Sequence, residues 1–136
     1  MPEKLVIYTD GGARGNPGPA AIGAVIYGAG ERPLRQIGEY IGSGTNNQAE
    51  YKALIRGLTE AAALGAKEAL CFLDSELVVR QLTGKYKVKE PELKNLAAEV
   101  FKISNKFLRV EFKHVGREKN KLADKLVNEA LDKAEF

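Results

Sequence analysis

Two aspartates in this sequence follow short apolar runs, at positions where a carboxylate could do chemistry. Asp10 comes after the β-prone residues 5–9 and opens the glycine- and proline-rich residues 11–19, whereas Asp74 follows the apolar residues 70–73. A carboxylate at the end of a buried strand costs stability unless a nearby group favours negative charge. Because glycines beside Asp10 allow another molecule's backbone to come close, this pattern is typical of a metal or phosphate site.

Two further acids lie in stretches with helical periodicity. Glu50 faces the apolar side of its helix, because the helical neighbours on that side are Ala53, Leu54, Gly57, Leu58 and Ala61. Asp124 borders an apolar stripe that contains Val127 and Leu131. Each acid also has a structural interpretation: Asp74 could cap a helix, Glu50 could favour a helix dipole, and Asp124 could lie on the surface.

Convergence of these four acids would need a cation to be stable. Two unit charges about 4 Å apart repel by roughly 4 kcal/mol at an effective dielectric constant near 20. Oxygen-only ligand sets favour Mg²⁺ or Mn²⁺, and paired ions about 4 Å apart promote in-line hydrolysis of phosphodiesters. The glycine-rich segment matches neither the P-loop nor the dinucleotide fingerprint, because no Gly-Lys-Ser/Thr follows and no helix opens directly after it.

The rest of the sequence predicts the elements that must position these side chains. Alternating or continuous apolar runs predict strands over residues 5–9, 20–27, 34–41, 69–73 and 107–114. Helical spacing predicts helices over residues 49–64, 75–82, 91–104 and 120–134. We expect Asn46 or Asn47 to cap the first helix and Gly65 to end it. This order of strands and helices predicts an α/β fold with one central mixed sheet covered by helices.

Length and composition favour a single domain over residues 1–136, with 44% apolar residues to form its core. No apolar run approaches the roughly 20 residues of a membrane span, so no membrane partner is expected. The single cysteine, Cys71, lies in an apolar run, which favours buried packing in a reducing compartment and a cytoplasmic location. The net charge of +3 permits a nucleic-acid partner without arguing for one.

Four segments, all in order, resemble the motifs of type 1 ribonuclease H, and the resemblance spans nearly the whole chain. These segments are residues 9–12 with 15–18, residues 45–50, residues 73–75 and residues 120–126. The resemblance implies a five-stranded mixed sheet, with three antiparallel N-terminal strands followed by parallel strands, flanked by helices. It also implies a metal-dependent endonuclease that cuts the RNA strand of RNA/DNA hybrids and leaves 5′-phosphate and 3′-hydroxyl ends.

Carried over to this sequence, the resemblance makes Asp10, Glu50, Asp74 and Asp124 the catalytic, metal-binding acids, with two Mg²⁺ or Mn²⁺ ions per site. It also implies that the hybrid is contacted by Gly11, Asn16, Thr45, Asn46, Asn47 and Gln48. Short amide side chains can meet the 2′-hydroxyls of the RNA strand in a wide minor groove. Thr45 resembles part of a pocket for a phosphate of the DNA strand.

Two departures from the family pattern bear on function. Many relatives carry a loop histidine before the last acid, but the only histidine here, His114, continues the predicted last strand, so we expect a structural role for it. Arg117 is our candidate for a helper near the metals, with a solvated loop charge as the alternative. The helix and basic loop that some relatives insert for gripping the hybrid are missing from residues 84–94. Hybrid affinity is therefore expected to be weaker and strongly salt-dependent.

Two other functions remain open at this level. A non-catalytic nucleic-acid-binding domain would keep the shape without the reaction, and a nuclease of broader preference would cut double-stranded RNA or DNA. No obligate protein partner is inferred, and a monomer is expected.

Overall fold

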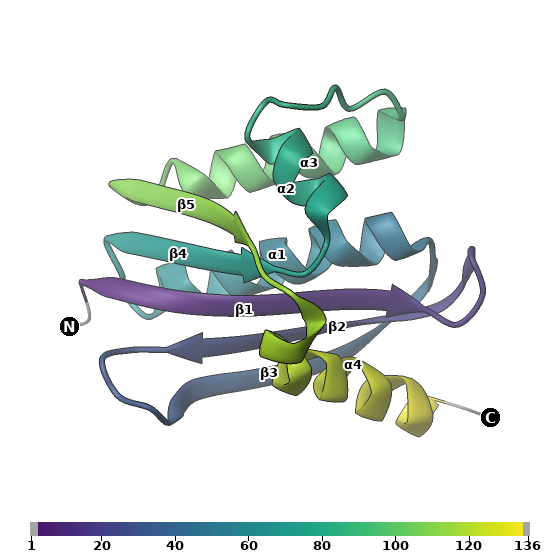
Figure 1. Ribbon diagram of the computed structural model, residues 1–136, viewed down its shortest axis with the longest axis horizontal. Coiled ribbons are helices and arrows are strands. Elements are labelled where there is room, and N and C mark those ends of the chain that lie inside the picture. Colours follow the sequence, from purple (N-terminus) through teal and green to yellow (C-terminus); the bar gives the residue numbers. More distant parts are fainter. Residues whose placement is uncertain (1–2, 135–136) are drawn as a thin grey trace.

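The computed structural model describes residues 3–134, which form a five-stranded sheet with helices on both faces (Figure 1). The predicted single domain over residues 1–136 also includes Met1, Pro2, Glu135 and Phe136, which lie outside the described residues. In chain order the elements are β1 (Lys4–Ala13), β2 (Gly18–Tyr27), β3 (Pro33–Gly44), α1 (Asn46–Ala63), β4 (Glu68–Leu73), α2 (Glu76–Leu82), α3 (Pro91–Ser104), β5 (Arg109–His114), the short 3₁₀ helix η1 (Arg117–Lys119) and α4 (Lys121–Ala134).

The sheet confirms the predicted α/β class. Its strand order is β3-β2-β1-β4-β5, in which β1, β2 and β3 pair antiparallel while β4 and β5 run parallel to β1. Parallel strands need a crossover, and α1 supplies it between the hairpin strands and β4. Within residues 3–134, no helix is long and apolar enough to cross a membrane.

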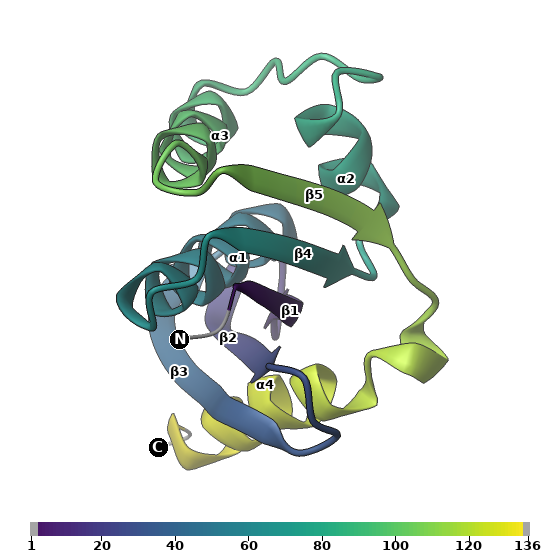
Figure 2. The same ribbon diagram turned by 90° about the vertical axis from the view of Figure 1, so that its left-hand side faces the viewer.

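Side chains of the central strands alternate between two cores. Ile26 on β2 packs with Leu54 and Leu58 of α1, whereas Ala21 on the same strand packs with Val127 of α4. Because successive residues of a strand point to opposite faces, α1 and α4 cover opposite sides of the sheet, as Figure 2 shows. Both faces of β2 are therefore buried, which explains its nearly unbroken apolar sequence.

Strand β1 is longer than predicted, and Asp10 lies within it rather than at its end. Residues 10–13 continue the antiparallel pairing with β2, from Asp10 opposite Gly23 to Ala13 opposite Ala20. The parallel pairing with β4 stops earlier, at Thr9 opposite Leu73. Asp10 is thus the first residue of β1 without a β4 neighbour, which leaves this side of the strand open.

Two predicted helix starts also change. The N-cap of α1 is Thr45 rather than Asn46 or Asn47, because the Thr45 hydroxyl accepts a hydrogen bond from the Gln48 N–H at 3.1 Å. The Gln48 side chain accepts in return from the Thr45 N–H at 2.9 Å, which completes a capping box. Ser75 caps α2, so the Asp74 carboxylate is not used as a helix cap.

Strand β5 begins at Arg109, two residues later than predicted. The Phe107 N–H bonds the Ser104 carbonyl in the turn after α3, and the Leu108 N–H bonds the Lys67 carbonyl. These residues therefore belong to the connection, although Phe107 packs in the core.

Candidate active site

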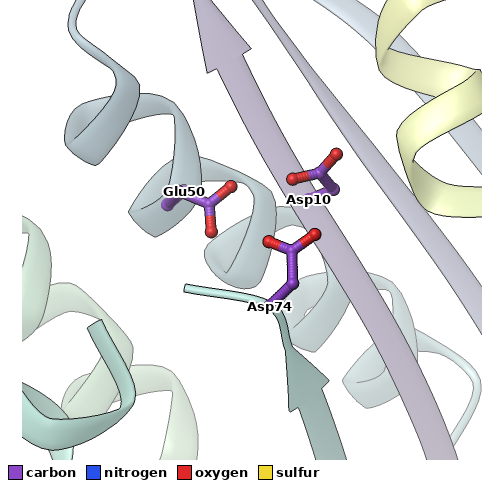
Figure 3. Close-up of side chains that lie close together, drawn as sticks. All are labelled: Asp10, Glu50 and Asp74. Carbon is purple, nitrogen blue, oxygen red and sulfur yellow. The ribbon is translucent and has the colours of Figure 1, made fainter. Parts of the chain in front are cut away.

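Three of the predicted acids meet where β4 ends. Figure 3 shows the carboxylates of Asp10 on β1, Glu50 on α1 and Asp74 after β4 pointing toward one another. Each brings one carboxylate oxygen within 4.8 Å of the others. Asp124 on α4 lies outside this trio but lines the same cleft, whose volume is about 410 Å³. The structure therefore brings all four acids to one cleft, from four segments spread along the sequence.

Gly11 allows Glu50 to reach Asp10. A Cβ atom at Gly11 would lie 2.2 Å from the carbonyl carbon of Ala49, so only glycine lets the first turn of α1 approach β1 this closely. The Gly11 N–H donates to Oε1 of Glu50 at 2.6 Å and fixes the carboxylate. Gly11 thus has a packing role against α1, in addition to the contact with the hybrid that the sequence predicts.

Asp124 is positioned by close packing at the start of α4. A Cβ atom at Gly23 would lie 2.3 Å from the Ala123 carbonyl oxygen, so the helix backbone sits directly on β2. The buried Asn120 side chain donates to the Thr9 carbonyl at 2.8 Å. These contacts tie the helix that carries Asp124 to the strand that carries Asp10.

The two innermost acids are strongly perturbed. Asp10 and Glu50 are only 8% and 6% exposed. Burial raises the pKa of Asp10 to about 7, and the charges of Asp74 and Asp124 add to the rise. Burial, followed by repulsion from Asp10, raises the pKa of Glu50 well above its ordinary value, while the Gly11 N–H opposes this in part. An oxygen-only cluster of this kind fits Mg²⁺ or Mn²⁺, because a bound cation would favour the charged forms.

Amide side chains form one wall of the cleft. Asn46 and Asn47 line it, and Oδ1 of Asn46 accepts from the Ala13 N–H at 2.9 Å. The Asn46 N–H donates in turn to Oδ1 of the exposed Asn16 at 3.0 Å. The turn after β1 and the start of α1 therefore form one polar surface beside the acids.

Thr45 and Gln48 do not line the cleft. Both are engaged in the capping box, and the Gln48 amide nitrogen also donates to Oε2 of Glu92 at the start of α3. In the structure these two side chains hold the helix start that presents Asn46 and Asn47. Their predicted contact with a hybrid stays a prediction.

Arg117 and His114 occupy different places. Arg117, on η1, is exposed and lines the carboxylate cleft, whereas His114 ends β5 opposite Leu73 and lines a separate pocket.

Sequence reasoning missed Arg14 and Asn128, which also line the cleft. Asn128 lies one helical turn after Asp124 and donates to its carbonyl at 3.1 Å, so the spacing of four residues was the available signal.

Comparison with known proteins finds one matching family and several solved relatives. The model of the family described as Reverse transcriptase-like matches residues 8–130. The chain is 46% identical over 132 residues to a bifunctional protein of Mycobacterium tuberculosis, covering 96% of this chain but 36% of that protein. The structure of the N-terminal RNase H domain of that protein superimposes with a TM-score of 0.92. The chain thus spans about a third of the length of the first curated relatives it matches.

Two further solved structures cover almost the whole of both chains. RNase H1 of the archaeon Halobacterium salinarum is 41% identical, with a TM-score of 0.94 and coverage of 96% of this chain and 99% of that one. LC11-RNase H1, isolated from compost by a metagenomic approach, was solved in complex with an RNA/DNA hybrid. It is 51% identical, with a TM-score of 0.90 and coverage of 96% and 98%.

Proposed function

The chain belongs to the Reverse transcriptase-like family and, among its members, to the ribonucleases H; on this premise we propose that its carboxylate cleft hydrolyses the RNA strand of RNA/DNA hybrids. The observation that carries the proposal is the convergence of Asp10, Glu50 and Asp74 within 4.8 Å, with Asp124 in the same cleft. The products would carry 5′-phosphate and 3′-hydroxyl ends. The first curated relatives are much longer than this chain, which covers 36% of the bifunctional protein. The activity is therefore proposed for this chain and is not taken from those whole proteins.

The four acids would hold two divalent cations, Mg²⁺ or Mn²⁺. When bound, such ions activate a water molecule and stabilise the charge that develops on the scissile phosphate. The chain itself positions the ligands, because close packing at Gly11 and Gly23 fixes the backbones that carry Glu50 and Asp124. Its work is placement and electrostatics rather than covalent catalysis.

The amide wall would contact the hybrid. Asn46 and Asn47 line the cleft and Asn16 is tied to them, so their side chains can meet 2′-hydroxyls and base edges in the minor groove. Thr45 would contribute to a pocket for a DNA-strand phosphate, and Gln48 would support it through the capping box. Gly11 would contact the hybrid through its backbone atoms, since the first turn of α1 fills the space beside its Cα atom.

Arg117 would act as a helper beside the acids, because its exposed guanidinium lines their cleft. Arg117→Ala should lower kcat several-fold with little change in KM, whereas Lys119→Ala on the same 3₁₀ helix should leave both unchanged. Equal effects of the two substitutions would reduce Arg117 to a solvated loop charge.

Cleavage of labelled duplexes tests the proposal directly. RNA/DNA, RNA/RNA and DNA/DNA duplexes of one sequence are incubated with Mg²⁺, with Mn²⁺ and with EDTA. We expect the RNA strand of the hybrid to be cut only when a divalent ion is present. Binding without cleavage would favour a non-catalytic domain, and comparable cutting of RNA/RNA would favour a broader nuclease.

We also propose that the chain acts as a monomer in the cytoplasm. The buried thiol of Cys71, its only cysteine, supports a reducing compartment. Light scattering on the purified protein and fractionation of cells would test these two points.

A further inference from the structure

A second pocket, of about 300 Å³, lies beside α2 and brings together three side chains that can donate to an anion. Arg80 comes from α2, Lys85 from the turn that follows it, and His114 from the end of β5. The other lining residues are Glu76, Val79, Thr83 and Phe112. None of these residues lines the carboxylate cleft, so the pocket is a distinct site.

Main-chain hydrogen bonds place Lys85 over the end of α2. The Lys85 and Tyr86 N–H groups both donate to the Arg80 carbonyl, at 2.8 and 3.1 Å. Gly84 has a φ of 80°, which lets the chain fold back in this way. The Lys85 backbone is therefore fixed relative to Arg80 by the turn itself.

The Arg80 guanidinium is held in place but keeps an unused donor. Its Nη2 lies 3.5 Å from Oε2 of Glu76, and its central carbon lies 5.4 Å from the centre of the Tyr86 ring. Its buried Nε has no hydrogen-bond partner within the described part of the chain. Because this Nε is buried, a ligand would reach the exposed part of the Arg80 side chain, which is 39% exposed. A guanidinium there is suited to a phosphate, which accepts several hydrogen bonds at once.

The charge of the pocket favours an anion. Glu76 is the only acid among its lining residues, against Arg80, Lys85 and the His114 imidazole. Across residues 3–134, neither Lys85 nor His114 takes part in an ion pair. The pocket thus offers hydrogen-bond donors from three segments, with the Glu76 carboxylate as the one acidic group among them.

The pocket adjoins the acids along both chain and sheet. His114 lies opposite Leu73, the residue before Asp74, and neighbouring strands are about 4.8 Å apart. Glu76 lies two residues after Asp74, at the start of the helix that carries Arg80. A nucleic-acid strand carries one phosphate about every 3.4 Å along the duplex axis. When one phosphate of a strand lies in the carboxylate cleft, a nearby phosphate of the same strand can therefore reach this pocket.

We propose that Arg80, Lys85 and His114 bind a backbone phosphate of the hybrid next to the one in the carboxylate cleft. The proposal rests on the proposed function and deepens it, because it names a contact that a chain without the basic insertion would use to hold its substrate. The site differs from the one expected at Thr45, which lies at the start of α1.

Binding of a fluorescent hybrid in EDTA, followed by anisotropy, tests the site without cleavage. Lys85→Ala should raise Kd about 3- to 10-fold at low salt and lower the slope of log Kd against log salt by roughly one. Lys85→Arg should restore binding, because it keeps the charge. Lys106→Ala, a matched change of an exposed lysine before the start of β5, should behave as the wild type. Equal Kd and slope for Lys85→Ala and Lys106→Ala would overturn the proposal.

Neutral methylphosphonate linkages identify the phosphate. One linkage is placed in turn at each position of either strand, with a 2′-deoxyribose on its 5′ side in the RNA strand. We expect one position at which neutralisation weakens binding of the wild type but not of Lys85→Ala. Absence of any such position overturns the proposal, and competition by inorganic phosphate alone would then indicate a free-anion site.

The two failures are distinguishable. One outcome is a linkage whose neutralisation weakens binding of the wild type but not of Lys85→Ala, together with no cleavage of any duplex. That outcome would support the phosphate site and contradict the proposed nuclease activity. The opposite outcome is cleavage of hybrids together with equal hybrid binding by Lys85→Ala and the wild type, which would support the activity and contradict the phosphate site.

Discussion

The two halves of the carboxylate cleft differ in how far the protein encloses them. Asp10 and Glu50 are buried, with raised pKa values, and the Gly11 N–H fixes one of them. Asp74 is half-buried and Asp124 is exposed. The inner pair is therefore set by the fold before any ion binds, whereas the outer pair lies where ions and substrate would enter.

Asp10→Asn should have the largest effect on activity. The substitution keeps the shape of the side chain but removes the innermost charge, so we expect cleavage to fall by roughly a thousandfold or more. Single-turnover cleavage of a hybrid gives the rate, and circular dichroism checks that the fold is kept. Activity within tenfold of the wild type would contradict the central place of the inner pair.

Asp124→Asn should cost less, about ten- to a hundredfold, because this exposed acid lies outside the trio. Extra Mg²⁺ should recover part of the loss, since a weakened site binds its ion less tightly. The same cleavage assay over a series of Mg²⁺ concentrations measures this. Glu129→Gln, an exposed acid on the same helix, serves as the control. A loss as large as that of Asp10→Asn would erase the difference between the two halves.

The smallest expected effect is the pH dependence of the stability of the metal-free protein. Asp10 and Glu50, the inner pair, determine whether stability rises or falls with pH. With the pKa of Asp10 at about 7 and that of Glu50 raised, the folded state binds more protons than the unfolded chain between about pH 4 and pH 7. The free energy of unfolding should therefore fall by roughly 2–4 kcal/mol as pH rises through this window. Asp10→Asn should flatten the profile.

Thermal unfolding in EDTA and in Mg²⁺ measures this dependence. Mg²⁺ should raise Tm above about pH 7, where the carboxylates are charged, and add little near pH 4. A Tm in EDTA that increases from acid to neutral pH would mean that other groups outweigh the inner pair.

Convergence of Asp10 and Asp74 was predictable because it rests on the pairing of two neighbouring parallel strands. Asp74 follows the carboxyl end of β4, and the parallel pairing of β4 with β1, which stops at Thr9, places Asp10 beside it. The continuation of β1 was not predictable in the same way, because Gly11 and Gly12 disfavour a strand and only pairing with β2 extends it. The cap at Thr45 could have been found, since Thr45 and Gln48 have the spacing of a capping box.

Contacts between distant segments lay beyond the sequence. Gly84 after the helix is a sequence signal for the turn that folds Lys85 back on Arg80. Nothing in the order of residues shows that His114 joins them, because the register of β5 decides that. The same holds for Asp124, whose place depends on how closely α4 packs on Gly23.

The early end of β4 also bears on self-association. Past Thr9, β1 presents an unpaired edge inside the sheet, and such edges invite strands from other molecules. The Glu50 carboxylate accepts the Gly11 N–H that an added strand would otherwise bond, and four acidic side chains line the opening. The acids proposed to hold the metals would thus also keep foreign strands away, so variants that neutralise several of them would lose protection against aggregation together with activity.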